Sequence, residues 1–118
     1  MKVIYLASPY SHPDEQVRES RYLEAVDACH DIINLGHCPF SPIVHSHPIA
    51  LRHGSGLGFD SWMKIDFEMI CRCDELWILN IEGYDESEGV AKEKQYALIK
   101  GLPVSDFFPK RILEEYGY

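Results

Sequence analysis

Asp66 is the residue whose position in this chain most clearly indicates chemistry. If residues 59–73 form a helix at about 100° per residue, their apolar side chains fall on one stripe, with Asp66 at its centre. The apolar members of this stripe are Phe59, Trp62, Met63, Met69, Ile70 and Cys73. A carboxylate on a core-facing stripe is costly unless it is paired, hydrogen-bonded or facing a polar cleft. Asp66 is therefore a candidate site residue.

A second candidate lies in the stretch YDESEGVAKE at residues 84–93, which opens a predicted helix. The N-terminus of a helix carries free N–H groups and a partial positive charge, so it binds anions well. Ser87 adds a hydroxyl donor at this end, Gly89 allows the backbone to come close to a ligand, and Glu93 follows on the same helix. The pattern leaves open a plainer interpretation, in which Ser87 only caps the helix and Glu93 is a surface charge.

Alternating strands and helices must position these side chains. We predict strands at residues 2–7, 37–44, 75–80 and 102–105, and helices at residues 13–35, 59–73 and 87–100. The first helix is indicated by an apolar repeat at Tyr22, Val26, Cys29 and Ile33. Residues 45–58 contain many helix breakers and have no clear period, so we predict a long loop that could hold one helical turn.

Strands that alternate with helices require crossover connections, which favour a parallel sheet. The expected fold class is α/β, with a doubly wound, flavodoxin-like or Rossmann-like sheet of about four or five mostly parallel strands flanked by helices. Ligands of such folds bind at the carboxyl ends of the strands. The segments that follow the first three strands, residues 8–12, 43–58 and 80–89, are therefore expected to meet at one edge.

The composition limits the classes of partner. The chain has 118 residues, 46% hydrophobic and 25% charged, which is typical of one globular domain, expected here to span residues 1–118. A formal charge of −8 argues against polymeric nucleic acid or an anionic membrane as the main partner. No apolar run approaches the roughly 18 residues needed to cross a bilayer. Four cysteines without a secretory leader are expected to be reduced thiols in a cytoplasmic protein.

Three segments make the chain resemble the nucleoside 2-deoxyribosyltransferase superfamily, which includes the 2'-deoxynucleoside 5'-phosphate N-hydrolases and the CMP N-glycosidases. The segments are IYLASPY, KIDFEMICRCDELWIL and SEGVAKEKQYALIKGLPV, and the resemblance covers roughly residues 2–105. The last segment is the most specific, with a small-residue turn, a glutamate, and then a helix that ends in Gly-x-Pro-Val. The pattern Trp…Asp…SEGV…E looks closest to a phage and bacterial branch of the superfamily.

The resemblance implies roles for individual positions. Glu93 matches the catalytic glutamate that attacks the anomeric carbon and holds a covalent glycosyl intermediate. Asp66 matches an aspartate that contacts the sugar or base and assists proton transfer, and Tyr10 matches the aromatic residue that lines the sugar pocket and positions the nucleophile. Ser87 matches the serine that the nucleotide hydrolases place on the 5'-phosphate. Ser8, with Gly89, is expected to contact substrate.

The function implied is hydrolysis of the N-glycosidic bond of a (deoxy)nucleoside 5'-monophosphate, with release of free base and sugar phosphate. Ser87 favours a monophosphate because the nucleoside transferases have an aspartate there, and a carboxylate repels phosphate. The alternatives are base exchange by a nucleoside 2-deoxyribosyltransferase and a non-catalytic nucleotide sensor of the same fold. No cofactor is expected. The expected partners are a small-molecule nucleotide or nucleoside, and further copies of the chain in a homodimer or higher homo-oligomer.

Several further residues are candidates for substrate contact. The first strand is followed by SPYSHPDEQ in place of the glycine-rich phosphate loop of the N-hydrolases, so Arg21 or Arg18 could supply a cation. In the histidine-rich segment, His45 and His47 are expected to face the pocket. A metal site is the weaker alternative there, because the spacing matches no zinc pattern. Trp62 is expected in the core, with stacking on a base as the alternative role.

Overall fold

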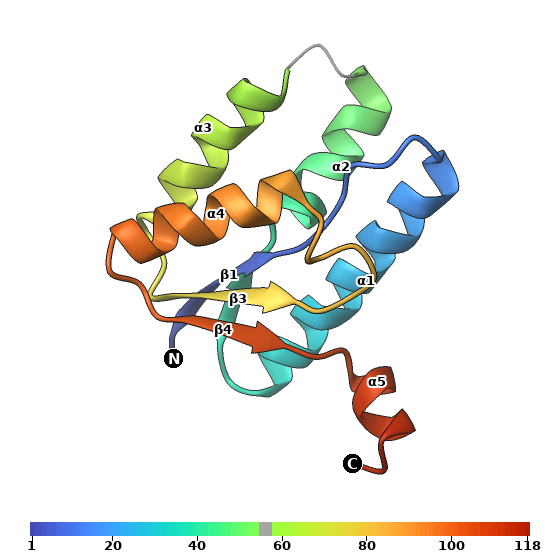
Figure 1. Ribbon diagram of the computed structural model, residues 1–118, viewed down its shortest axis with the longest axis vertical. Coiled ribbons are helices and arrows are strands. Elements are labelled where there is room, and N and C mark those ends of the chain that lie inside the picture. Colours follow the sequence, from blue (N-terminus) through green and yellow to red (C-terminus); the bar gives the residue numbers. More distant parts are fainter. Residues whose placement is uncertain (55–57) are drawn as a thin grey trace.

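The computed structural model describes residues 1–54 and 58–118, and this part of the chain forms four strands and five helices (Figure 1). In chain order the elements are β1 (Val3–Ala7), α1 (Glu15–Asn34), β2 (Cys38–Phe40), α2 (Pro42–His53), α3 (Phe59–Ile70), β3 (Glu75–Leu79), α4 (Glu88–Ile99), β4 (Val104–Phe107) and α5 (Lys110–Glu115). The predicted alternation of strands and helices is confirmed.

The strands form one parallel sheet in the order β2-β1-β3-β4. The register pairs Leu6 of β1 with Trp77 of β3, and Ile78 of β3 with Asp106 of β4. Because β2 lies on one side of β1 and β3 on the other, the connections that leave β1 and β3 diverge. This arrangement opens a crevice at their carboxyl ends, where doubly wound folds bind ligands. The expected flavodoxin-like fold class is confirmed.

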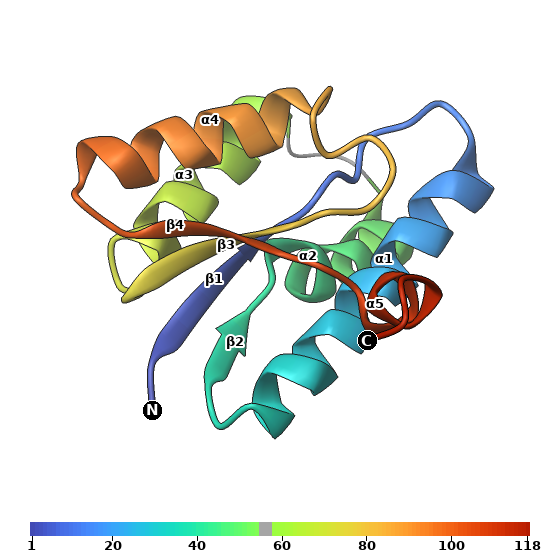
Figure 2. The same ribbon diagram turned by 60° about the horizontal axis from the view of Figure 1, so that its bottom comes forward.

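Helices cover both faces of the sheet (Figure 2). Successive residues of a strand point to opposite faces, so β1 contributes to two cores. Tyr5 and Ala7 pack in the core on the side of α3 and α4. Ile4 and Leu6 pack on the other side, against Ile32 of α1. All five side chains are fully buried. The sheet is therefore held between two apolar layers.

Helix α1 forms where it is predicted, but its buried side differs from the expected repeat. The fully buried positions are Ala25, Ala28 and Ile32, whereas Ile33 is 58% exposed. The other members of the expected repeat are only partly buried. Two alanines allow the helix to lie close to the sheet, so the small residues and not the large apolar ones define its inner side.

The segment that was predicted to be a long loop forms helix α2, so this prediction is wrong within the described residues. Ser41 caps the helix, since the Val44 N–H donates to its Oγ at 3.1 Å. Pro42 occupies the first turn, where the missing N–H costs nothing. Strand β2 consequently ends at Phe40 and is shorter than the predicted 37–44. The last part of the predicted loop, residues 55–57, lies outside the described residues.

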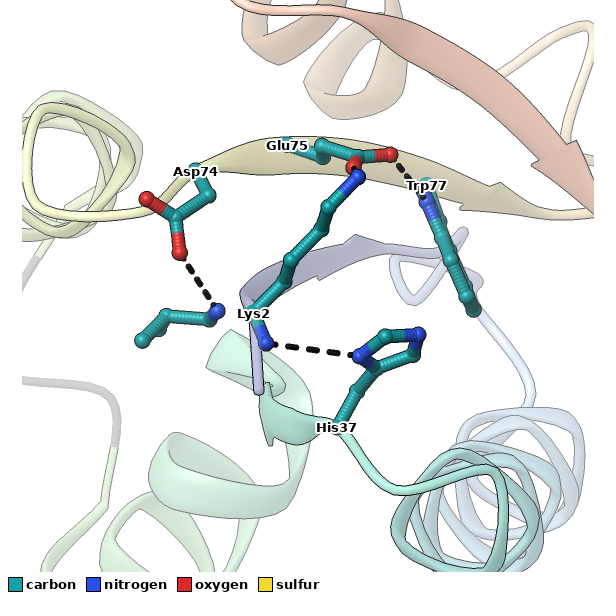
Figure 3. A network of polar contacts seen from close by, with 6 residues as sticks. Lys2, His37, Asp74, Glu75 and Trp77 are labelled. Atoms are coloured by element: carbon teal, nitrogen blue, oxygen red, sulfur yellow. Dashed lines mark hydrogen bonds and ion pairs between the residues drawn. The ribbon is translucent and has the colours of Figure 1, made fainter.

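Polar contacts join the strands at the edge of the sheet opposite the crevice (Figure 3). The Lys2 ammonium donates to the Glu75 carboxylate at 2.5 Å, and the Lys2 backbone N–H donates to His37 Nδ1 at 3.4 Å. The Val3 N–H donates to the Asp74 carboxylate at 2.7 Å. The exposed ion pair contributes little to stability. Together these contacts fix the start of β1 relative to β2 and β3.

None of the helices within residues 1–54 and 58–118 combines the length and the apolar character that a membrane span requires.

The packing of α1 gives a test of the fold. Replacing Ile32 by Ala removes a fully buried side chain between α1 and the sheet, and should lower the free energy of unfolding by about 2–5 kcal/mol. The neighbouring change Ile33→Ala is the control, and should cost less than about 1 kcal/mol because that side chain is largely exposed. Urea denaturation of both variants measures the difference. Equal losses would contradict the observed orientation of the helix.

Candidate active site

A pocket of about 480 Å³ opens at the carboxyl ends of β1 and β3. Its walls come from the segment after β1, from helices α1, α2 and α3, and from the segment that joins β3 to α4. The lining of the pocket includes these candidate site residues: Ser8, Tyr10, Arg21, His47, Asp66, Ser87, Gly89 and Glu93. The pocket therefore lies where the fold class predicts a ligand.

Two acidic side chains from different helices meet in this pocket. Asp66 of α3 is 7% exposed and Glu93 of α4 is 3% exposed. Helices α3 and α4 pack against each other on one face of the sheet. Asp66 lies on the inner stripe of α3 with Met63 and Ile70, and Glu93 lies on the inner side of α4 with Ala97. The apolar stripes of both helices thus carry their acids into the pocket.

Burial raises the pKa of both acids toward neutral pH. Desolvation, together with the nearby charge of Asp66, raises the pKa of Glu93 to about 8, while the hydrogen bond from Tyr5 opposes the shift. Desolvation also raises the pKa of Asp66 to about 7. Because burial disfavours the charged form of each carboxyl group, both acids can hold a proton near neutral pH. Such a pair offers one acid and one base at neutral pH.

The hydrogen bond to Glu93 comes from Tyr5 and not from Tyr10, which was expected to position this carboxylate. The fully buried Tyr5 hydroxyl donates to Glu93 Oε2. Burial and the charge of Glu93 raise the pKa of Tyr5 well above its usual value. The sequence did carry a signal for this contact, because a tyrosine inside a buried strand needs a partner for its hydroxyl.

Tyr10 instead belongs to a second polar cluster at the side of α2. Its hydroxyl lies 2.6 Å from His47 Nδ1, and His47 Nε2 lies 2.7 Å from Glu19 Oε2. The ring of Tyr22 stacks on the imidazole with the centroids 4.3 Å apart. His47 is 4% exposed and lines the pocket, where it was expected. Sequence reasoning missed Glu19 and Tyr22, because their role depends on α2, which was not predicted.

The N-terminus of α4 lies beside the carboxyl group of Glu93. Ser87 is the N-cap, and its Oγ accepts from the Val90 N–H at 3.2 Å, which leaves its own proton free to donate. A Cβ atom added at Gly89 would lie 3.8 Å from Ser87 Oγ and 3.9 Å from Glu93 Oε1. The first turn of α4, which can bind an anion, and the carboxyl group of Glu93 therefore face the same part of the pocket.

Comparisons with known proteins identify the family of this chain. A family model described as "Domain of unknown function (DUF1937)" matches residues 2–108. A solved 2-deoxyribosyltransferase from the psychrotolerant bacterium Bacillus psychrosaccharolyticus is 30% identical, with a TM-score of 0.60, over 91% of this chain and 72% of that one. The chain belongs to the nucleoside deoxyribosyltransferase-like superfamily. A comparison with curated proteins gave no match.

Three other residues that the superfamily resemblance or the sequence singled out also line the pocket. Ser8 is 5% exposed, and its Oγ has no hydrogen-bond partner within residues 1–54 and 58–118. Arg21 donates from Nη1 to the Ser11 carbonyl at 2.9 Å, and its guanidinium fills the space that a side chain at Gly83 would need. Trp62 is half-buried at the wall of the pocket. Ser8 and Arg21 thus offer polar groups to a ligand.

His45 is not among the residues that line the pocket, in contrast to the expectation from its place soon after the second predicted strand. Its side chain lies on the outer side of α2, where Nδ1 is 3.3 Å from Ser46 Oγ and the ring is 6.0 Å from that of Phe40. The helical conformation explains the difference, because His45 and His47 lie two residues apart and so point to different sides. In the part of the chain that the structure describes, no group of three or more His, Cys, Asp or Glu residues is placed to hold a metal.

The raised pKa values predict that stability depends on pH. Glu93 binds its proton more tightly in the folded state, with a pKa raised from 4.5 to about 8, and Asp66 likewise, from 3.8 to about 7. The free energy of unfolding should therefore fall as the pH rises from about 4 to about 8. The double variant Asp66→Asn, Glu93→Gln should escape this loss, and at pH 9 should be more stable than the unmodified protein by on the order of a few kcal/mol.

Urea denaturation at pH 4 and pH 9 measures this effect. The control is Glu68→Gln on the outer side of α3, where the side chain is 64% exposed, and it should follow the unmodified protein at both pH values. A difference between the double variant and the unmodified protein that does not change with pH would contradict the buried, protonated state of the two acids.

Proposed function

We propose that this protein is an enzyme that breaks the N-glycosidic bond of a nucleoside or nucleotide. The observation that carries the proposal is the convergence of Asp66 and Glu93, buried and from separate helices, on one pocket. Membership of the nucleoside deoxyribosyltransferase-like superfamily supports nucleoside-processing glycosyl transfer as the class of reaction. A small nucleoside or nucleotide is the proposed partner, and the proposed mechanism needs no cofactor.

The proposed mechanism uses both acids. The ionised Glu93 attacks the anomeric carbon, the bond from this carbon to the base nitrogen breaks, and the electron pair leaves with the base, which receives a proton from Asp66. Water then attacks the same carbon, Asp66 takes a proton from it, and Glu93 is released as a carboxylate. The raised pKa of Asp66, about 7, supports its role as proton donor and acceptor near neutral pH. Tyr5 supports the role of Glu93, because its hydrogen bond favours the ionised form of this carboxyl group.

The proposed substrate is a (deoxy)nucleoside 5'-monophosphate, and the products are free base and sugar phosphate. The N-terminus of α4 supports this choice, because Ser87 can donate a hydrogen bond and the helix end favours an anion. Arg21 lines the same pocket and adds a positive charge. The sugar would lie between these groups and Glu93, since Gly89 brings the helix end next to the carboxyl group.

Base exchange is the second candidate function. It is favoured by the similarity to a 2-deoxyribosyltransferase and by the acids Glu86 and Glu88, which also line the pocket and would repel a phosphate. In transfer, a second base replaces the water in the second step. A nucleotide sensor without turnover is the third candidate. Incubation with nucleosides and nucleoside monophosphates, with and without a second base, separates the three by chromatography of the released base.

A homodimer or higher homo-oligomer and a cytoplasmic location remain part of the proposal, as does a single domain over residues 1–118. The exposed aromatic residues Tyr116 and Tyr118, which are 77% and 87% exposed, support association because such side chains are often covered in an interface.

Glu93→Gln tests the nucleophile. The amide keeps the shape of the side chain and can still accept from Tyr5, but it cannot attack the sugar, so base release should fall by at least about a thousandfold while the protein stays folded. Circular dichroism checks the fold, and Glu68→Gln on the outer side of α3 is the matched control. Retained turnover, after mass spectrometry has excluded deamidation to glutamate, would refute the assignment.

Ser87→Asp tests the monophosphate. Aspartate also caps helices well, so α4 should remain intact, but its charge would repel a phosphate and shift preference toward free nucleosides by about tenfold or more. Ser87→Asn is the matched control, because it caps the helix without adding charge. The ratio of kcat/KM for a monophosphate to that for its nucleoside measures the change. An unchanged ratio in the aspartate variant would remove the support that Ser87 gives to a nucleotide substrate.

A further inference from the structure

The pocket has two chemically different ends. The end formed by α4 holds Ser87, Gly89 and Glu93, and a Cβ atom added at Gly89 would lie within 4 Å of both Ser87 Oγ and Glu93 Oε1. The end formed by α2 and α3 is lined mainly by apolar side chains, which are Pro42, Ile43, Ala50, Phe59, Trp62 and Met63. A flat nucleobase needs apolar and aromatic surface. With the sugar at Glu93, as in the proposed function, the base lies at the apolar end.

Tyr10 lines the pocket, and its hydroxyl contacts His47 of α2, one of the two helices that form the apolar end. His47 in turn contacts Glu19 of α1 through its other ring nitrogen. The imidazole is held on three sides, because Tyr22 stacks on it at an interplanar angle of 23° and Tyr10 meets it edge-on at 78°. His47 is 4% exposed. The orientation of this ring is therefore fixed before any ligand binds.

The chain of hydrogen bonds determines the direction in which the Tyr10 hydroxyl donates. A carboxylate can only accept, so the contact of 2.7 Å to Glu19 requires a proton on His47 Nε2. In the neutral imidazole Nδ1 is then bare and can only accept. The Tyr10 hydroxyl, 2.6 Å away, must donate its proton to Nδ1. What the hydroxyl can still offer to a ligand is a lone pair on its oxygen.

We propose that the Glu19–His47–Tyr10 chain makes Tyr10 a hydrogen-bond acceptor for the base and so selects bases that carry an exocyclic amino group over those that carry an oxo group there. The inference rests on the proposed function for the position of the base. An amino group donates to the Tyr10 oxygen. An oxo group would place one acceptor against another, and leaving such groups unpaired in a partly buried site weakens binding by about tenfold or more.

Glu19 is the residue that sets this preference without touching the base. In a Glu19→Gln variant, the amide N–H can donate to a bare Nε2, which moves the imidazole proton to Nδ1. Nδ1–H then donates to the Tyr10 oxygen, and the hydroxyl proton becomes available to an oxo group. The preference for amino bases should fall toward equality. Tyr10→Phe removes the hydroxyl and should abolish the preference altogether.

The first experiment reads the tautomer of His47 by nitrogen-15 NMR of the histidine rings in the ligand-free protein, with a His47→Gln variant to assign the signals. The expected result is a ring protonated at Nε2 alone, which changes in Glu19→Gln and stays the same in Glu24→Gln. Glu24 is the matched control, because it lies on α1 and pairs with Arg111. A ring protonated at Nδ1, or at both nitrogens, would overturn the inference.

The second experiment measures binding of matched pairs by calorimetry on the Glu93→Gln protein, so that turnover does not interfere. The pairs are cytidine with uridine 5'-monophosphate and adenosine with inosine 5'-monophosphate. The expected result is binding of the amino member of at least one pair that is about tenfold tighter. That preference should be lost in Tyr10→Phe, reduced in Glu19→Gln and kept in Tyr96→Phe, a matched control whose hydroxyl contacts Cys71 outside the pocket.

The outcomes separate this inference from the proposed function. Equal binding within both pairs, or an unchanged preference in Tyr10→Phe, would overturn the role of Tyr10 while base release by the unmodified protein still supports the N-glycosidic reaction. Absence of both binding and base release would overturn the two proposals together.

Discussion

The burial of two carboxyl groups in one pocket is the constraint on which the rest of the structure depends. Asp66 and Glu93 lie on the inner sides of α3 and α4, where an apolar side chain would pack with less cost. Burial removes both carboxyl groups from water and so raises the pKa of Asp66 to about 7 and that of Glu93 to about 8, with the charge of Asp66 adding to the shift of Glu93. Charged groups that lower stability in this way are common at functional sites.

The sheet divides the molecule into an edge that supports the fold and an edge that carries the site. At the amino ends of the strands, Lys2, Asp74 and Glu75 join the strands through hydrogen bonds and an ion pair (Figure 3). At the carboxyl ends, the pocket is bordered by the segments after β1 and β3. Arg21 connects these two segments, since it donates to Ser11 and lies against Gly83. The site is thus held by contacts between segments as well as by the sheet.

Most elements could be predicted because they follow from local patterns. The apolar runs of β1 and β3, the cap at Ser87 and the periodic stripe around Asp66 all depend on residues within a few turns of one another. Helix α2 was missed because its internal proline and its many histidines hide a capped start at Ser41. The inner side of α1 was misjudged by one residue, since close approach to the sheet favours Ala25 and Ala28 over Ile33.

The sequence by itself determined the α/β fold class, the helices that bear Asp66 and Glu93, and the helix N-terminus beside Ser87, because periodicity and capping are properties of neighbouring residues. Only the tertiary structure decided which tyrosine holds Glu93 and what Tyr10 does instead. Tyr5 and Glu93 are 88 residues apart in the chain, and Tyr10 and His47 are 37 apart. Hydrogen bonds over such separations depend on how β1, α1, α2 and α4 pack together. Patterns of neighbouring residues do not predict that packing.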